Sequence, residues 1–114
     1  MNRYEYLVLT RALTGTDEEF NRWYDQQHLA DVLAVPGFVS ARRFRVLSAA
    51  TLGGGEPPQW QYVAIYEMEC DDPQATIAEL LRRADTEQMP LSETLERATV
   101  VTFLLRQTTE QSRP

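Results

Sequence analysis

Four segments of the 114-residue chain have the hydrophobic pattern of β-strands. Residues 4–10 (YEYLVLT) are rich in aromatic and branched aliphatic side chains, which favour a strand. Residues 38–47, 60–70 and 98–107 show the same enrichment, with alternation along each segment. Residues 48–59 contain three consecutive glycines and two consecutive prolines, so we expect a loop there that could gate a pocket.

A helix is predicted between the first two strands. The sequence TDEE at residues 16–19 has the form of a capping box, in which Thr16 and Glu19 bind the backbone of the first turn. We expect this helix to run from residue 17 to residue 29 or 33. It should stop before the Pro-Gly pair at residues 36–37.

A second helix is predicted between the third and fourth strands. Asp72 is placed to cap it and Pro73 to occupy its first turn. Four apolar residues follow at helical spacing: Ile77, Leu80, Leu81 and Ala84. The element order is therefore β-α-β-β-α-β, which predicts an α+β, ferredoxin-like fold with an antiparallel sheet.

Several strands are apolar on both sides, which has a consequence for assembly. In the first strand, Tyr6 and Val8 alternate with Leu7 and Leu9, and the third and fourth strands repeat this pattern. The two helices can cover only one face of the sheet. No chain is left for the other face, so we expect a homodimer in which two sheets pack face to face around a barrel.

Composition indicates a single domain over residues 1–114. The net charge of −6 argues against a nucleic-acid partner, and no segment is apolar enough to cross a membrane. All 11 basic residues are arginine, which excludes Schiff-base chemistry on a lysine. The single cysteine, Cys70, fits a cytoplasmic protein and is expected to be a small buried apolar residue.

The only histidine, His28, lies near the end of the first predicted helix. On a regular helical wheel, the inward stripe of this helix begins aromatic and turns polar, with His28 beside it: Phe20, Trp23, Tyr24, Gln27 and Asp31. Burying such polar groups in a dry core is costly. Either the helix has ended by this point and these groups face water, or they line a cavity that uses them.

If the cavity interpretation holds, His28 is the natural acid or base, because its side chain titrates near neutral pH. Asp25 or Asp31 could orient its ring, and Tyr24 could share its face of the helix. The alternative interpretation is structural: a histidine near a helix C-terminus interacts favourably with the helix dipole. One histidine and one cysteine make a protein-only metal site improbable, so we expect no metal and no bound cofactor.

Aromatic side chains supply the candidate substrate pocket. Tyr6, Trp23, Phe44 and Tyr66 are the residues we expect to line it, as such sites are mostly apolar. Packing in the core is the alternative role for the strand tyrosines. Arg42, one of three arginines in the second strand, could hold an acidic substrate if its strand face points inward.

The segment EEFNRWYDQQHLADVLAVPGFVSARRF resembles the first-helix signature of the EthD-like branch of the dimeric α+β barrel superfamily. The signature is an aromatic pair, a histidine and a Pro-Gly before the second strand, here Trp23, Tyr24, His28, Pro36 and Gly37. Where relatives often carry His-x-Pro, this chain has His28-Leu29-Ala30. The resemblance implies a homodimer with a central barrel and one cleft per subunit.

The relatives in that superfamily include cofactor-free monooxygenases, polyketide cyclases, muconolactone isomerases and haem-degrading enzymes, so the resemblance does not select one reaction. The sequence favours a small cytoplasmic enzyme that acts on an aromatic or polyketide-like molecule by proton transfer through His28. Isomerase, lyase, cyclase and monooxygenase reactions stay open. A non-catalytic ligand-binding protein and a haem-binding barrel with His28 as axial ligand are the alternatives.

Overall fold

The predicted strands form one antiparallel sheet with the order β2-β3-β1-β4 in a computed structural model, which describes residues 1–114. The strands span Asn2–Thr10 (β1), Phe38–Arg45 (β2), Tyr62–Cys70 (β3) and Val101–Leu105 (β4). The fourth strand begins later than predicted because a 3-10 turn, η2 (Arg97–Thr99), precedes it. The α+β, ferredoxin-like fold predicted from the sequence is confirmed.

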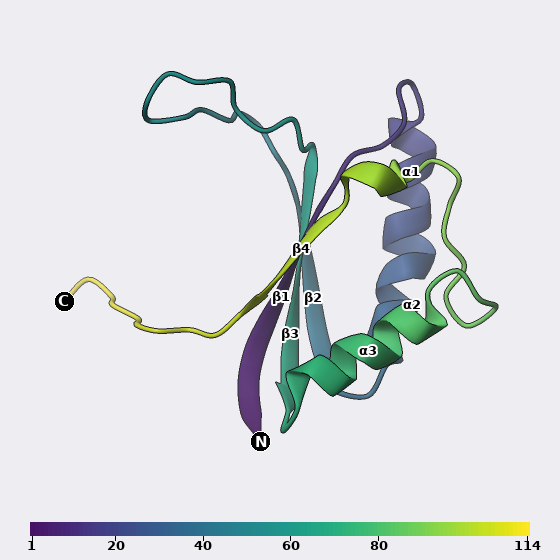
Figure 1. Ribbon diagram of the computed structural model, residues 1–114, viewed down its shortest axis with the longest axis vertical. Coiled ribbons are helices and arrows are strands. Elements are labelled where there is room, and N and C mark those ends of the chain that lie inside the picture. The colour runs from purple at the N-terminus through teal and green to yellow at the C-terminus, as the bar shows by residue number, and fades with distance from the viewer.

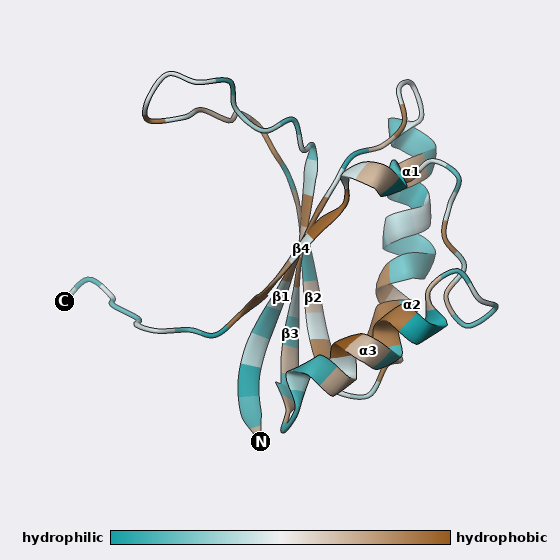
Figure 2. Cartoon of the chain, viewed as in Figure 1, coloured by the Kyte–Doolittle hydropathy of each residue, from teal (hydrophilic) through white to brown (hydrophobic).

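Both predicted helices lie on the same side of the sheet (Figure 1). The first is a continuous helical rod made of α1 (Asp17–Trp23), a π-helical turn η1 (Tyr24–His28) and α2 (Leu29–Leu33). The second is α3 (Pro73–Arg83). Figure 2 shows hydrophobic residues along α2, α3 and β4. None of the helices is long and apolar enough to span a membrane.

The two predicted helix starts differ in outcome. Asp72 caps α3 as expected, because its Oδ1 accepts a hydrogen bond from the Ala75 amide at 3.2 Å. The capping box of the first helix does not form. The Thr16 hydroxyl instead donates to the Leu13 carbonyl at 2.7 Å, so the turn that precedes the helix uses the group that was expected to cap it.

The π-helical turn changes which residues of the first helix face the sheet. One extra residue in the turn shifts the later residues around the helix axis. Gln27, which a regular wheel places on the inward stripe, is exposed, whereas Val32 is buried. The core therefore continues from Phe20 and Tyr24 to Val32, so the inward side regains an apolar residue after His28.

The helix-covered face of the sheet is the core of the protein. Its side chains are almost fully buried: Tyr4, Tyr6, Tyr62, Ala64, Tyr66 and Met68. The opposite face, which we name the open face, has no layer over it (Figure 1). Its centre is apolar, with Leu7 paired to Ile65 on one side and to Phe103 on the other.

The side chains of β2 do not alternate regularly between the two faces of the sheet, because the strand contains an irregularity. Phe38 pairs with Met68 but Ser40 pairs with Glu67, so the register shifts by one residue between them. Phe38 is therefore buried on the helix-covered face, whereas Arg42 and Phe44 are turned to the open face. Strict alternation along residues 38–47 predicts all three on one side of the strand, and the register shift shows that this prediction is wrong.

Candidate functional site

A mostly apolar cavity lies between the sheet, the first helix and α3. Its volume is about 150 Å³, and 13 of its 16 lining residues are hydrophobic, so it suits a small ligand with an apolar body. A cavity of about this size accepts a benzene-sized ring. Leu81 of α3 lines the cavity while 63% exposed, which places the cavity within reach of solvent at that side.

The structure brings five of the eight predicted site residues to this cavity: Tyr6, Trp23, Tyr24, His28 and Tyr66. They come from β1, β3 and the first helix, and Tyr6 and Tyr66 are direct neighbours in the sheet. Asp31 lies on the same helix but does not line the cavity. Arg42 and Phe44 point to the open face, so they do not belong to this site.

Two aromatic rings hold the imidazole of His28. The Trp23 ring stacks on it with centroids 4.6 Å apart, and the Tyr24 ring meets it edge-on at 4.8 Å. The Trp23 indole is itself fixed, because its Nε1 donates to the Pro90 carbonyl at 3.3 Å. This arrangement depends on the π-helical turn, which ends at His28; such turns often occur at functional sites.

His28 is neutral at neutral pH. Burial, and secondly the positive charge of Arg43, lower the pKa of His28 from 6.5 to about 4. Its Nδ1 atom is buried and has no hydrogen-bond partner. A buried ring nitrogen without a partner is rare in a packed core, and this one belongs to a residue that lines the cavity.

Neither carboxylate that was expected to orient His28 does so. Asp25 instead accepts a hydrogen bond from Arg43 Nη1 at 2.8 Å. The Oδ2 atom of Asp31 is buried without a partner, so it makes no bond to the imidazole. The ring is positioned by aromatic contacts, because the π-helical turn displaces these carboxylates from the places that a regular helix gives them.

Tyr24 and Tyr66 form a hydroxyl pair at the wall of the cavity. The Tyr66 hydroxyl donates to the Tyr24 oxygen at 3.0 Å. Burial raises the pKa of both phenols, so both remain protonated at neutral pH. Two neutral phenols beside a neutral imidazole give the apolar cavity a small set of polar groups.

Arg43 lies against the Tyr24 ring at the edge of the site, and the sequence did not predict it as a site residue. Its guanidinium carbon lies 4.1 Å from the centre of the Tyr24 ring, and its side chain is only 11% exposed. Nε and Nη2 of Arg43 are buried without partners. The register shift in β2 turns Arg43 rather than Arg42 toward the helices, and no pattern of residue types in this strand signals the shift.

Few groups near the cavity could hold a metal or haem. The structure contains no group of three or more His, Cys, Asp and Glu side chains that could bind a metal ion. Cys70 is free and buried, as expected from the sequence. His28 lines the cavity and could ligate a haem iron, so haem binding stays a prediction from the sequence.

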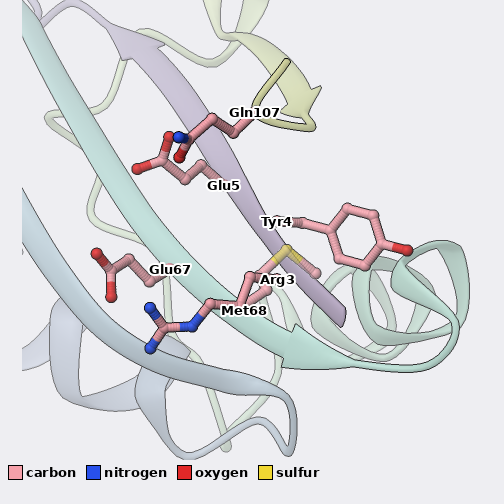
Figure 3. Close-up of a pocket in the computed structure, with 6 residues that line it drawn as sticks. All are labelled: Arg3, Tyr4, Glu5, Glu67, Met68 and Gln107. Carbon is pink, nitrogen blue, oxygen red and sulfur yellow. The ribbon is translucent and has the colours of Figure 1, made fainter. Parts of the chain in front are cut away.

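A second hollow, at the far end of the sheet, has a different character (Figure 3). It measures about 80 Å³, and Figure 3 shows Arg3, Glu5, Glu67 and Gln107 around it. Arg3 is already paired with Glu69 at 2.7 Å, and these side chains are largely exposed. The two buried residues that line this hollow, Tyr4 and Met68, belong to the core, so the cavity at His28 is the candidate site.

Comparison with known proteins supports the fold. No protein-family model matches the sequence, and no curated protein matches it significantly. A proposed monooxygenase from Shewanella loihica PV-4 superposes with a TM-score of 0.61 at 12% identity, covering 96% of this chain and 97% of that one. An ethyl tert-butyl ether D (EthD) family protein from Bacillus halodurans C-125 gives 0.56 at 10% identity, covering 93% and 99%.

The chain shares the fold of these two proteins over nearly its whole length. The resemblance drawn from the first-helix signature is therefore confirmed at the level of the fold. At 10% and 12% identity the likeness does not transfer an activity. The function has to be argued from the cavity itself.

Proposed function

We propose that this protein is a small, cytoplasmic, cofactor-free enzyme that binds an aromatic or polyketide-like molecule and moves a proton with His28. The observation that carries the proposal is one side chain: a neutral imidazole, with a buried unpartnered nitrogen, at the wall of an apolar cavity. A structural histidine would satisfy its buried nitrogen within the protein. This one is available to accept a proton from a ligand.

The environment of His28 restricts the chemistry that it can support. The burial and the Arg43 charge that keep the imidazole neutral also disfavour an isolated imidazolium. Proton transfer becomes favourable when the ligand turns into an anion at the same moment, because the two new charges then stabilise each other at short range. The substrate should therefore carry an acidic C–H beside a carbonyl, or a phenolic O–H.

We also propose a homodimer built through the open face of the sheet. Leu7, Leu9 and Ile65 lie at its centre, and Phe44 and Phe103 are 44% and 49% exposed. A contiguous apolar patch across four strands is unusual on a monomer. The loop before β3 and the C-terminal tail both project on this side (Figure 1), where they could meet a second subunit.

Exchange of acidic protons tests the catalytic role without knowledge of the natural substrate. The α-protons of 2-indanone, a small aromatic ketone, should exchange for deuterium in D₂O faster with protein than in buffer, as followed by NMR. His28→Gln should lower this acceleration by about 100-fold or more. Gln27→Ala, on the exposed side of the same helix, is the matched control and should exchange at the parent rate.

Two outcomes would contradict the enzyme proposal. If 2-indanone binds but exchanges only at the buffer rate, the protein is a ligand-binding protein, the second interpretation of the sequence. If exchange is accelerated equally by the His28→Gln variant, another group removes the proton.

A further inference from the structure

The hydroxyl of Tyr24 has a donor but no acceptor. It accepts the hydrogen bond of Tyr66 at 3.0 Å, and no protein atom accepts the proton of Tyr24 in return. The residue is 2% exposed and lines the cavity. A buried hydroxyl that receives one hydrogen bond and has no protein acceptor is ready to donate to a group in the cavity, because leaving that donor unpaired is costly.

A cation lies against the ring of this same residue. The Arg43 guanidinium sits 4.1 Å from the Tyr24 ring centre, yet Arg43 does not line the cavity. Its one carboxylate partner, Asp25, is 58% exposed and therefore well solvated, whereas Nε and Nη2 are buried and unpaired. The positive charge of Arg43 therefore makes the electrostatic potential in the cavity more positive, although Arg43 itself contacts only the Tyr24 ring there.

The base and the donor are neighbours. The His28 and Tyr24 rings meet edge-on with centroids 4.8 Å apart. A ligand with its acidic proton against His28 can place an oxygen two or three bonds away against Tyr24. Hydrogen bonds to an anionic oxygen are stronger than those to a neutral one, so this pair favours a ligand in its anionic state.

We propose that the Tyr24 hydroxyl binds the oxygen of a phenolate or enolate ligand, and that Arg43 is a positioning residue that favours the anion through Tyr24. The proposal deepens the proposed function, on which it rests, by assigning the residues that bind and stabilise the anionic oxygen of the substrate. When a C–H proton moves to the His28 imidazole, the C–H electron pair forms the enolate C=C bond. The carbonyl π electrons move to oxygen, which accepts the Tyr24 hydrogen bond, and Tyr24 keeps its proton.

The probe that tests this site is 4-nitrophenol, because its phenol and phenolate forms absorb at different wavelengths. Nitrobenzene, which lacks the hydroxyl, is the matched ligand. The parent protein should bind 4-nitrophenol as the phenolate and lower its apparent pKa. Tyr24→Phe should weaken 4-nitrophenol binding by about 10-fold or more, the usual effect of losing a hydrogen bond to a charged group, and change nitrobenzene binding by less than about twofold.

Arginine variants separate the positioning role from simple packing. Arg43→Met keeps the length of the side chain and removes its charge, and it should raise the apparent pKa of bound 4-nitrophenol by about one unit. Arg45→Met is the control, since Arg45 is exposed two residues further along β2 and lies over Tyr62 instead. That variant should leave the pKa of the bound phenol unchanged.

The outcomes distinguish this proposal from the proposed function. Equal binding of 4-nitrophenol by the parent and Tyr24→Phe would overturn the oxygen site, even if His28 still drove exchange of 2-indanone. Tyr24-dependent phenolate binding without exchange would support the oxygen site and contradict the enzyme. If Tyr24→Phe does not fold, Tyr66→Phe replaces it: removing the donor to Tyr24 should weaken phenolate binding severalfold, and unchanged binding would overturn the proposal.

Discussion

The two faces of the sheet are built from alternating residues of the same strands, but they differ in burial and in residue type. Ile65 and Tyr66 are consecutive residues of β3, yet Tyr66 is 1% exposed beneath the helices and Ile65 is half-buried on the open face. The helix-covered face is rich in tyrosine, and its packing leaves a cavity. The open face is centred on aliphatic side chains that pack on nothing in this chain. One face holds the candidate site, and the other is the surface through which we propose that the homodimer forms.

The distribution of unsatisfied polar atoms sharpens the contrast. The partnerless buried atoms of His28, Asp31 and Arg43 come from the helix-covered side. On the open face, the charged residues are exposed and lie near opposite charges, as Arg3 does with Glu69 and Arg42 with Glu5. Native proteins tolerate few unsatisfied buried groups, so those of His28 and Arg43 support a functional role for this side of the sheet.

The largest effect is expected from a charge placed on the open face. Ile65→Asp should convert a dimer of about twice 13.1 kDa into a monomer, measured by sedimentation at micromolar concentration. The physical reason is that a carboxylate buried without a partner costs about 4 kcal/mol. If the dimer is obligate, Ile65→Asp should also lower the free energy of unfolding, because the separated subunit has no second sheet over its open face.

A variant of equal charge controls for this effect. Gln74→Glu adds one negative charge at an exposed position of α3, and it should leave mass and melting temperature unchanged. A well-folded parent that sediments as a 13.1 kDa monomer would contradict the face-to-face assembly.

The alternation that distinguishes the faces could be predicted from the sequence because it follows from a fixed period. Side chains along β1 and β3 alternate strictly, and the structure keeps this register over both whole strands, from Asn2 opposite Cys70 to Thr10 opposite Tyr62. The element order and the Asp72 cap followed from equally local rules. Five of the cavity-lining side chains were then identified from the aromatic residues of the first helix, β1 and β3 together with His28.

The side-chain orientations that could not be predicted lie where the regular helix or strand period is interrupted. The π-helical turn moves Gln27 outward and Val32 inward, and the register shift in β2 exchanges Arg42 for Arg43 at the site. A prediction that assumes a regular period of 3.6 residues in a helix or 2 in a strand cannot locate a single extra residue. Both irregularities border the candidate site, where local rules are expected to yield to function.

The next effect is confined to the helix-covered face and depends on pH. His28 has a pKa near 4 in the folded protein and 6.5 as a free side chain, so between these values only the unfolded chain binds the proton. The contribution of His28 to the free energy of unfolding is therefore fully present above about pH 6.5. It is lost as the pH drops toward 4, by about 3 kcal/mol in total. Urea unfolding at several pH values, compared with His28→Gln, isolates this contribution, and NMR of the single histidine reads its pKa directly.

His28→Gln should show a smaller loss of stability over the same pH range, because the carboxylates still titrate but the imidazole is gone. A parent protein that becomes more stable relative to His28→Gln on acidification would show that His28 is protonated and paired, which contradicts a neutral base in the cavity.

A smaller effect concerns the packing of the α2–β2 turn against α3. Gly37 has a φ of 107°, and a Cβ there would lie 2.8 Å from Cγ2 of Thr76 in α3. Gly37→Ala should cost about 2 kcal/mol from backbone strain and crowding, measured by urea unfolding, without changing the oligomeric state. Thr76→Ala in the same chain should recover the part due to crowding. Full stability of the single variant would mean that the α2–β2 turn is free to rearrange.

The smallest effect is expected in the loop of residues 48–59, which extends beyond the sheet. The sequence suggested that this loop gates a pocket. No residue of 48–59 lines the cavity at His28, Leu52 is fully exposed, and the Thr51 hydroxyl bonds only within the loop, to Gly55. Replacing residues 52–57 with a shorter Gly-Ser linker should therefore change stability by less than about 0.5 kcal/mol, since closure entropy varies slowly with loop length. Thermal unfolding, sedimentation and 4-nitrophenol binding should all match the parent. A large fall in melting temperature would show that the loop packs on the partner subunit, and weaker binding alone would restore its role as a gate.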